Sequence, residues 1–246
     1  MGKRFSKDYQ VTYYDCDAQS QMKLSCLVGI MLYYSGIQCA ELGRPDSYFH
    51  ALGLTWVVTN YEITINRMPT DNEKLTITTE AKAYNKFFTY REFQVLDEKG
   101  NLLVTLETTF ALMKLADRKL GSLTAELLEP FEAEKVNTIK RAPKIPKLTA
   151  PISKSYEVRY SDLDANQHVN NTKYLEWSMD TLGMDFLTSH NITYIHVRFV
   201  KEISYGQVVE CLADIGENQT IHQILVDGTL HFECAIDWKK RGNHEI

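Results

Sequence analysis

The chain has 246 residues, of which 44% are hydrophobic and 24% charged, and its formal net charge is −5 at pH 7. This composition is typical of a globular protein that buries a core, and the negative charge excludes a chain built throughout for binding nucleic acid. No apolar run approaches the roughly 18–20 residues of a membrane span, and the N-terminus lacks the apolar segment of a signal peptide.

The five cysteines are odd in number and scattered, with no CxxC pair. This spacing argues against a disulfide framework and against a zinc site. It favours a reducing compartment, which we expect to be the cytoplasm.

The first half of the chain predicts a strand, a helix and four more strands. Residues 7–14 alternate as in a strand, a polar turn follows, and apolar residues from Leu24 recur at helical spacing for about five turns. Gly43 followed by Pro45 ends this helix. Four β-rich runs separated by short turns then predict an antiparallel meander: residues 56–65, 75–84, 87–96 and 102–115.

Residues 130–151 break this regularity, because they contain several prolines, lysines and arginines. Such a composition predicts an extended surface linker. We therefore expect an N-terminal domain over residues 1–129, a linker over 130–151 and a C-terminal domain over 152–246.

After the linker the order of elements repeats. A strand over 156–160, a polar turn and an amphipathic helix precede four more strands, at 194–200, 207–215, 220–226 and 230–238. A shift of 147 residues aligns five identical pairs: Val11 with Val158, Tyr13 with Tyr160, Asp15 with Asp162, Asp17 with Asp164, and Ala18 with Ala165. The shared order of elements, together with these pairs, predicts an internal duplication.

The polar turn of the second half concentrates groups that could carry chemistry. Asp164, Asn166 and His168 alternate, so an extended backbone would point all three the same way. Each alone is more often a turn, cap or core residue. Together, ahead of a helix, they could handle a proton and a developing negative charge. The first half has Gln19 and Gln21 instead of Asn166 and His168, and glutamine cannot cycle a proton near neutral pH.

The run DLDANQHVNNTKYLEW at residues 162–177 resembles the signature of acyl-(acyl carrier protein) thioesterases, which release fatty acids from their carrier in plastids and bacteria. The order of elements also fits this family. The resemblance implies an α+β fold of two tandem hotdog domains, in which each antiparallel sheet wraps a long helix. It implies hydrolysis of fatty acyl-(acyl carrier protein) without a metal or cofactor, and acyl carrier protein as the partner. We expect no nucleic-acid partner, and either a monomer or a homodimer.

The resemblance also implies roles for single residues of the second half. His168 would act as a base or orient water, Asp164 would hold the imidazole tautomer or stabilise the imidazolium, and Asn166 would donate to the thioester carbonyl or position the water. Glu202 matches a glutamate of the family that a cysteine follows in many plant members. Ile203 stands at that cysteine position and carries no nucleophile, which favours direct attack by water.

The resemblance places the acyl chain in the first domain, where the aromatic and small residues are also typical of an ordinary core. Its candidate lining residues are Met31, Tyr34, Ser35, Trp56 and Tyr61. Three alternatives stay open: an acyl-CoA thioesterase, a hydratase of enoyl thioesters, and a module that binds acyl thioesters without turnover. Acyl chain length and saturation are not predicted.

Overall fold

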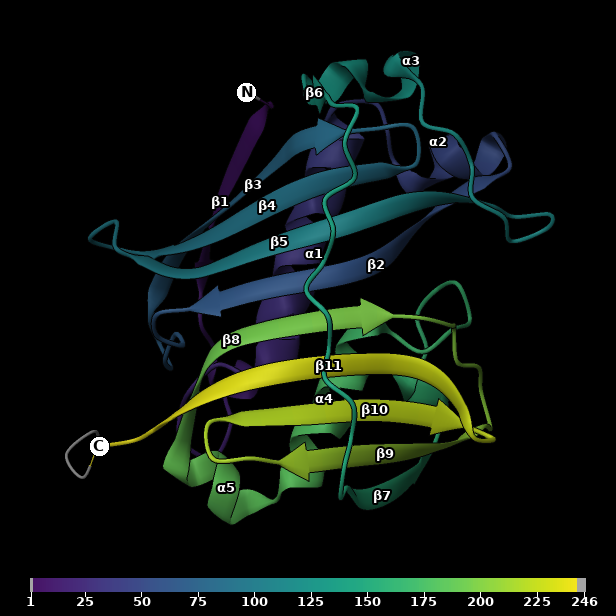
Figure 1. The fold of residues 1–246 in the computed structure, drawn as a ribbon. Coiled ribbons are helices and arrows are strands. Elements are labelled where there is room, and N and C mark those ends of the chain that lie inside the picture. Colours follow the sequence, from purple (N-terminus) through teal and green to yellow (C-terminus); the bar gives the residue numbers. More distant parts are fainter. Residues whose placement is uncertain (1, 243–246) are drawn as a thin grey trace. The chain divides into compact units, whose positions relative to one another are not determined.

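The computed structural model describes residues 2–242 (Figure 1). The chain divides into two compact units. The first comprises the residues up to 142 apart from 23–26, and the second comprises 23–26 and the residues from 143 onward. None of the helices within residues 2–242 combines the length and the apolar character that crossing a bilayer requires.

The first unit is an antiparallel sheet with a long helix against it. Its strands lie in the order β1-β3-β4-β5-β2, and the short strand β6 runs parallel to β3. The elements are β1 (Arg4–Gln10), α1 (Leu24–Glu41), α2 (Asp46–Ala51), β2 (Leu54–Ile65), β3 (Lys74–Tyr84), β4 (Phe88–Asp97), β5 (Leu102–Lys114), α3 (Ala125–Leu128) and β6 (Glu134–Lys135).

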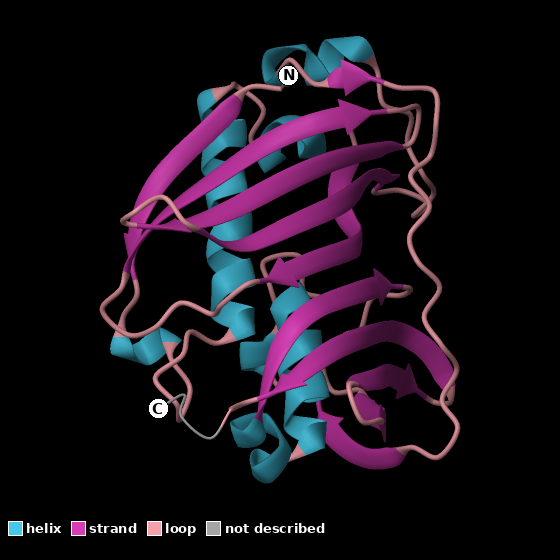
Figure 2. Cartoon of the chain, turned by 60° about the vertical axis from the view of Figure 1, so that its left-hand side comes forward, coloured by secondary structure: helices cyan, strands magenta, loops and turns pink. Residues whose placement is uncertain are grey.

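Helix α1 is the centre of this unit, and Figure 2 shows the sheet curving around it. Its 18 residues confirm the five turns predicted from the apolar spacing. Leu27, Val28 and Met31 are fully buried, so the predicted apolar face is the one that packs. The helix ends at Glu41; Gly43, two residues further on, has a φ of 69°, and the Arg44 N–H donates to the Cys39 carbonyl.

The first strand of each half ends earlier than predicted, and the physical reason is the same in both halves. β1 ends at Gln10 and β7 (Ile152–Glu157) at Glu157, and a 3₁₀ turn follows each. In these turns the Asp15 carboxylate accepts the Thr12 N–H at 2.8 Å, and the Asp162 carboxylate accepts the Arg159 N–H at 2.9 Å. These local bonds compete with continued strand pairing.

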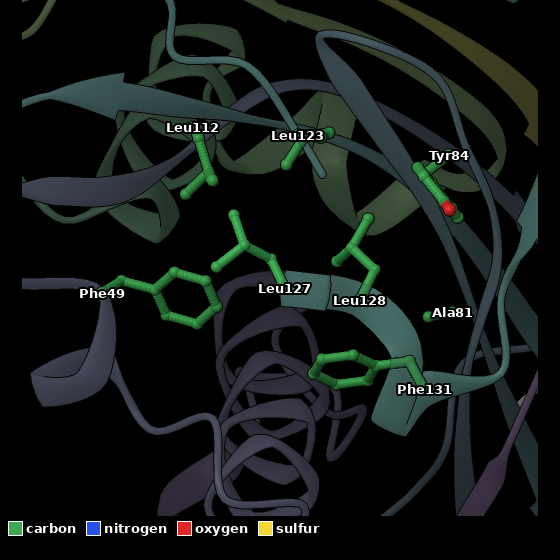
Figure 3. Close-up of a cluster of buried hydrophobic side chains, with 8 residues drawn as sticks. All are labelled: Phe49, Ala81, Tyr84, Leu112, Leu123, Leu127, Leu128 and Phe131. Carbon is green, nitrogen blue, oxygen red and sulfur yellow. The ribbon is translucent and has the colours of Figure 1, made fainter. Parts of the chain in front are cut away.

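The first part of the predicted linker belongs to the fold of the first unit. Phe131 is only 4% exposed and joins the buried cluster around Phe49 and Leu127 (Figure 3). Further along, the Lys140 ammonium lies 3.1 Å from Glu62 and 2.6 Å from Glu107. Residues 130–142 are therefore anchored to the first unit, and they do not form a free tether.

The second unit repeats this architecture with a shorter helix. Its strands lie in the order β8-β11-β10-β9-β7, with antiparallel neighbours throughout. Besides β7, the elements are α4 (Asn171–Leu182), α5 (Met184–Ser189), β8 (His190–Phe199), β9 (Val208–Ile215), β10 (Gln219–Val226) and β11 (Thr229–Lys240). Helix α4 packs on β7, β9 and β10 through a face that includes Leu175 and Trp177. Each unit thus has the hotdog arrangement of a curved sheet and a helix.

Candidate active site

The loop before α4 is a tight hairpin, so the expectation of an extended 164–168 segment is wrong. The Asp164 N–H donates to the His168 carbonyl at 2.8 Å, and the Gln167 N–H donates to the Asp164 carbonyl at 3.0 Å. Gln167 has a φ of 64°, in the left-handed region that closes such turns. Asp164, Asn166 and His168 therefore do not share one face of a strand.

The Asp164 carboxylate is the anchor of this hairpin. One of its oxygens accepts the Asn166 N–H at 2.8 Å and the His168 N–H at 3.4 Å, as in an Asx turn. Within residues 2–242 no hydrogen bond joins this carboxylate to the His168 imidazole. The Asn166 side chain is exposed at the tip of the loop and makes no hydrogen bond to another described residue.

The imidazole of His168 instead meets Glu202, which lies 34 residues further along the chain. Its Nε2 is 3.4 Å from the Glu202 carboxylate. Two backbone contacts set this register: His168 bridges to Ser204, and the Val169 N–H donates to the Ile203 carbonyl at 2.8 Å. The separation is slightly longer than a good hydrogen bond, which is common in catalytic pairs without substrate.

Asp162 and Asn170 connect this hairpin to the start of α4. The Asn170 side chain caps the helix by accepting the Thr172 N–H at 3.0 Å, and the Asn170 N–H donates to the Asp162 carbonyl at 2.9 Å. Burial would raise the pKa of the Asp162 carboxyl, but hydrogen bonds from Arg159 and the charges of Arg159 and Lys173 outweigh it and lower that pKa. The site thus lies beside a capped helix N-terminus, where partial positive charge favours an anion.

Tyr174 and His231 also belong to the site, although sequence reasoning gave neither a role in it. The Tyr174 hydroxyl lies near the backbone N–H of Ile203. Burial raises the pKa of this phenol, and the negative charges of Glu202 and Asp164 raise it further. His231 Nδ1 donates to the Glu202 carbonyl at 3.0 Å. The sequence could have indicated Tyr174, because this residue stands in the signature run. It could not have indicated His231, because the contact of His231 depends on the pairing of β8 with β11.

The five candidate acyl-lining residues lie in the first unit, on α1 and β2. Met31 and Tyr61 are fully buried. The Tyr34 hydroxyl donates to the Asp8 carbonyl at 2.9 Å and the Ser35 hydroxyl to the Leu32 carbonyl at 2.8 Å, so both polar groups are satisfied by backbone. Trp56 packs edge-on against Phe49. These contacts are those of a core, and the acyl-binding role stays a prediction.

The equivalent loop of the first half has the same backbone without the reactive pair. The Asp17 N–H donates to the Gln21 carbonyl at 2.8 Å, and Ser20 has a φ of 57°. The Met22 N–H donates to the Pro69 carbonyl at 2.8 Å, as Val169 does to Ile203. The residue before Pro69 is Met68, which stands where the second half has Glu202. Gln21 and Met68 cannot act as a base.

Two hotdog units in tandem, each with a hairpin ahead of its longest helix, define the class of double-hotdog proteins. A model of the acyl-ACP (acyl carrier protein) thioesterase N-terminal domain matches residues 2–131, and a model of the acyl-ACP thioesterase C-terminal domain matches residues 145–240. The chain therefore belongs to the acyl-ACP thioesterase family.

Individual relatives agree with this assignment. A crystal structure from Lactobacillus plantarum, provisionally described as an oleoyl thioesterase, matches with a TM-score of 0.95 and 34% identity over 98% of both chains. A 12:0-ACP thioesterase from Umbellularia californica shares the fold, with a TM-score of 0.85 at 20% identity over 97% of this chain and 98% of its own. A chloroplastic palmitoyl-acyl carrier protein thioesterase from Gossypium hirsutum is 24% identical over 95% of this chain; the chain spans 59% of that relative's length.

Proposed function

We propose that this protein hydrolyses the thioester of fatty acyl-(acyl carrier protein), releasing a free fatty acid and the carrier thiol and so ending chain elongation. The observation that carries the proposal is the 3.4 Å distance between His168 Nε2 and the Glu202 carboxylate. The first half has Gln21 and Met68 at the corresponding positions. A titratable pair placed on only one of two matching scaffolds is best explained by chemistry, because the scaffold itself folds without it.

The reaction needs an activated water and a stabilised oxyanion, but little help for the leaving group. A thiol has a pKa of about 8.5, so it departs as a thiolate. The His168–Glu202 pair would take a proton from water as the new C–O bond forms. The collapsing intermediate would then break the C–S bond and release the thiolate, which afterwards takes up the proton held by the pair. General base catalysis of this kind contributes about 10²–10⁴-fold.

The negative charge that forms on the carbonyl oxygen would be stabilised by donors around the hairpin. The Asn166 amide is exposed there and available to a ligand, and the N-terminus of α4 adds partial positive charge. A single such donor is worth about 10²–10³-fold in acyl-transfer enzymes. Asp164 would contribute by fixing the hairpin that presents both Asn166 and His168.

The structure of the second unit also supports water as the attacking group. Ile203 follows Glu202 and is fully buried. Among residues 143–242 the cysteines are Cys211 and Cys234, both buried; burial raises the pKa of the Cys211 thiol to about 12 and raises that of Cys234 as well. Thiols held protonated in this way are poor nucleophiles. The odd number and scattered spacing of the cysteines are also the basis on which we propose a cytoplasmic location.

The test is release of free thiol from acyl carrier protein loaded with acyl chains of graded length, measured with a thiol-reactive dye. We expect turnover by the wild type and a loss of about 10³-fold in His168→Ala. The matched control is Gln21→Ala, at the same position of the first hairpin, which should keep wild-type turnover. Unchanged turnover in His168→Ala would refute the proposed site.

Parallel reactions separate the alternatives. Equal efficiency on acyl-CoA would assign the protein as a general acyl thioesterase. Addition of water to an enoyl thioester, without thiol release, would assign a hydratase. Binding of the acyl carrier substrate with no turnover at all would leave a binding module.

A further inference from the structure

Glu202 lies between β8 and β9, outside both strands, so its position depends on contacts made by the surrounding main chain. His231 makes contacts on both sides of this point. Its Nδ1 donates to the Glu202 carbonyl at 3.0 Å. Its own carbonyl accepts the Val200 N–H at 2.9 Å and the Lys201 N–H at 3.1 Å. One residue of β11 thus holds the chain immediately before Glu202 and the carbonyl of Glu202 itself.

Tyr174 lies beside the next peptide unit. Its hydroxyl is near the Ile203 N–H, while the Ile203 carbonyl accepts the Val169 N–H at 2.8 Å. The tyrosine ring is only 3% exposed, and its centroid lies 5.5 Å from that of Phe199 and 5.3 Å from that of Phe232. A ring fixed by this packing gives its hydroxyl a defined position.

The first half has the same main-chain path without either contact. The Leu103 carbonyl accepts the Asn66 N–H at 2.9 Å and the Arg67 N–H at 3.4 Å, so Leu103 stands where the second half has His231. The shift of 147 residues that aligns the hairpins places Leu27 at the position of Tyr174. Neither leucine can hydrogen-bond through its side chain.

The first half also lacks a counterpart of the Ile203 backbone N–H. Pro69 accepts from Met22 as Ile203 accepts from Val169, so these two residues correspond. Proline has no N–H, and a tyrosine at position 27 would find no donor there. The half that lacks a carboxylate at position 68 therefore also lacks the counterparts of His231 and Tyr174, and its Met68 carbonyl accepts from the Arg67 guanidinium at 3.2 Å instead.

We propose that His231 and Tyr174 are positioning residues that hold the main chain of residues 202–203 so that the Glu202 carboxylate stays within reach of His168. Neither side chain needs to touch the substrate. This inference deepens the proposed function and rests on it. Displacement of a catalytic group by about 1 Å can cost about 10²-fold in rate, which sets the size of the effect.

The experiment compares Tyr174→Phe and His231→Leu with the wild type in acyl carrier substrate hydrolysis. We expect kcat to fall about 10- to 100-fold, with KM changed less than about twofold. His231→Gln, whose amide can still donate to the Glu202 carbonyl, should recover most of the loss. Matched controls are Tyr156→Phe, which loses a hydroxyl bonded to Asp180, and His222→Phe on β10; both should keep wild-type kcat.

Two further measurements separate positioning from general damage. In a Glu202→Gln background, Tyr174→Phe and His231→Leu should lower kcat by less than about twofold, because groups that act through Glu202 are non-additive with it. Amide hydrogen exchange of residues 200–206 should be faster in both variants, while exchange in β9 and β10 stays unchanged.

Wild-type kcat in both variants, or full additivity with Glu202→Gln, would overturn the inference. So would a fall in kcat with unchanged exchange at residues 200–206. A wild-type protein without turnover would refute the proposed function instead. The exchange measurement would still decide whether Tyr174 and His231 hold this segment.

Discussion

The hairpins of the two halves have the same main-chain hydrogen bonds and different side chains. In each, an aspartate closes the turn by accepting two N–H groups, Asp17 from Gln19 and Gln21 and Asp164 from Asn166 and His168. Ser20 and Gln167 take the same left-handed conformation. The hairpin is therefore a folding unit that does not need the histidine or the glutamate.

The halves differ at one position in the loop that follows β2 in the first half and β8 in the second. This position is occupied by Met68 in the first half and by Glu202 in the second. The second half places a carboxylate there, and His231 donates to the main-chain carbonyl of that residue; the first half places Met68 there, and its carbonyl accepts from the Arg67 guanidinium at 3.2 Å. The hairpin aspartate is present in both halves and does not distinguish them, whereas the histidine and the distant glutamate do; we therefore expect the latter two to mark the reactive half.

Exchanging the reactive side chains for those of the first half should have the largest effect. His168→Gln copies Gln21 and retains the hairpin, because the bonds of residue 168 within it come from the backbone. We expect about a 10³-fold loss of kcat with little change in the denaturation midpoint. Activity is measured by thiol release and folding by circular dichroism. Retained activity would mean that the halves do not differ in chemistry.

The cores of the two units should differ in how their stability depends on pH. His222 is 1% exposed, and burial lowers its pKa to about 4 from the usual 6.5. As the pH falls, the unfolded chain therefore binds a proton at this histidine before the folded chain does. The free energy of unfolding is highest above about pH 6.5 and decreases as the pH falls toward 4. Strand pairing places Phe93 at the matching position of the first unit.

His222→Phe should remove this pH dependence. Between pH 7.5 and 5, the free energy of unfolding of the second unit should fall by about 2 kcal/mol more in the wild type than in the variant. Denaturant titration at the two pH values measures the difference. Phe93→Leu serves as the control in the first unit and should leave the pH dependence unchanged. Equal acid sensitivity of wild type and His222→Phe would contradict the assignment.

The role of Asp164 can be separated from its charge. Asp164→Asn keeps an oxygen that can accept the two N–H groups of the hairpin, and we expect kcat within about threefold of the wild type. Asp164→Ala removes the acceptor, which should cost about 1 kcal/mol of stability and lower kcat about 10-fold. Asp17→Ala should cost similar stability and no activity. A large loss in Asp164→Asn would show that the charge itself is needed.

The smallest effect concerns the chain segment that leaves the first unit. Lys140 pairs with Glu62 and Glu107 at the surface, where such pairs contribute less than about 1 kcal/mol. Glu107→Gln should increase trypsin cleavage after Lys140 severalfold, because the segment detaches more often. Cleavage after Lys144 is the internal control, and Glu98→Gln, at an exposed pair with Lys74, is the control variant. Equal cleavage in all three proteins would show that the pairs do not hold the segment.

Sequence periodicity predicted the long elements well, because apolar spacing reflects burial directly. Helix α1 and the strands β2 to β5 lie within about two residues of their predicted bounds. The hotdog order of elements in each half is also confirmed. The short helices α2 and α5 were not predicted, since six residues provide too little periodicity to separate a helix from a turn.

The site was harder to predict than the fold, because its contacts are set by loops and by strand register. Alternation of Asp164, Asn166 and His168 suggested a shared face, but a left-handed residue at 167 folds them into a hairpin. The approach of Glu202 to His168 followed only from the family resemblance. His231 carried no local signal at all, since its contact spans 29 residues and depends on β8 pairing with β11.

The proline at position 69 has a consequence for the redesign of this molecule. Introducing histidine at 21 and glutamate at 68 would supply reactants to the first half, but the ring of Pro69 leaves no amide there for a supporting hydroxyl. If Tyr174 and His231 act as proposed, replacements at positions 27, 69 and 103, besides the two reactants, separate the first half from the arrangement of the second. An engineer seeking two reaction centres in one polypeptide would have to rebuild those supports first.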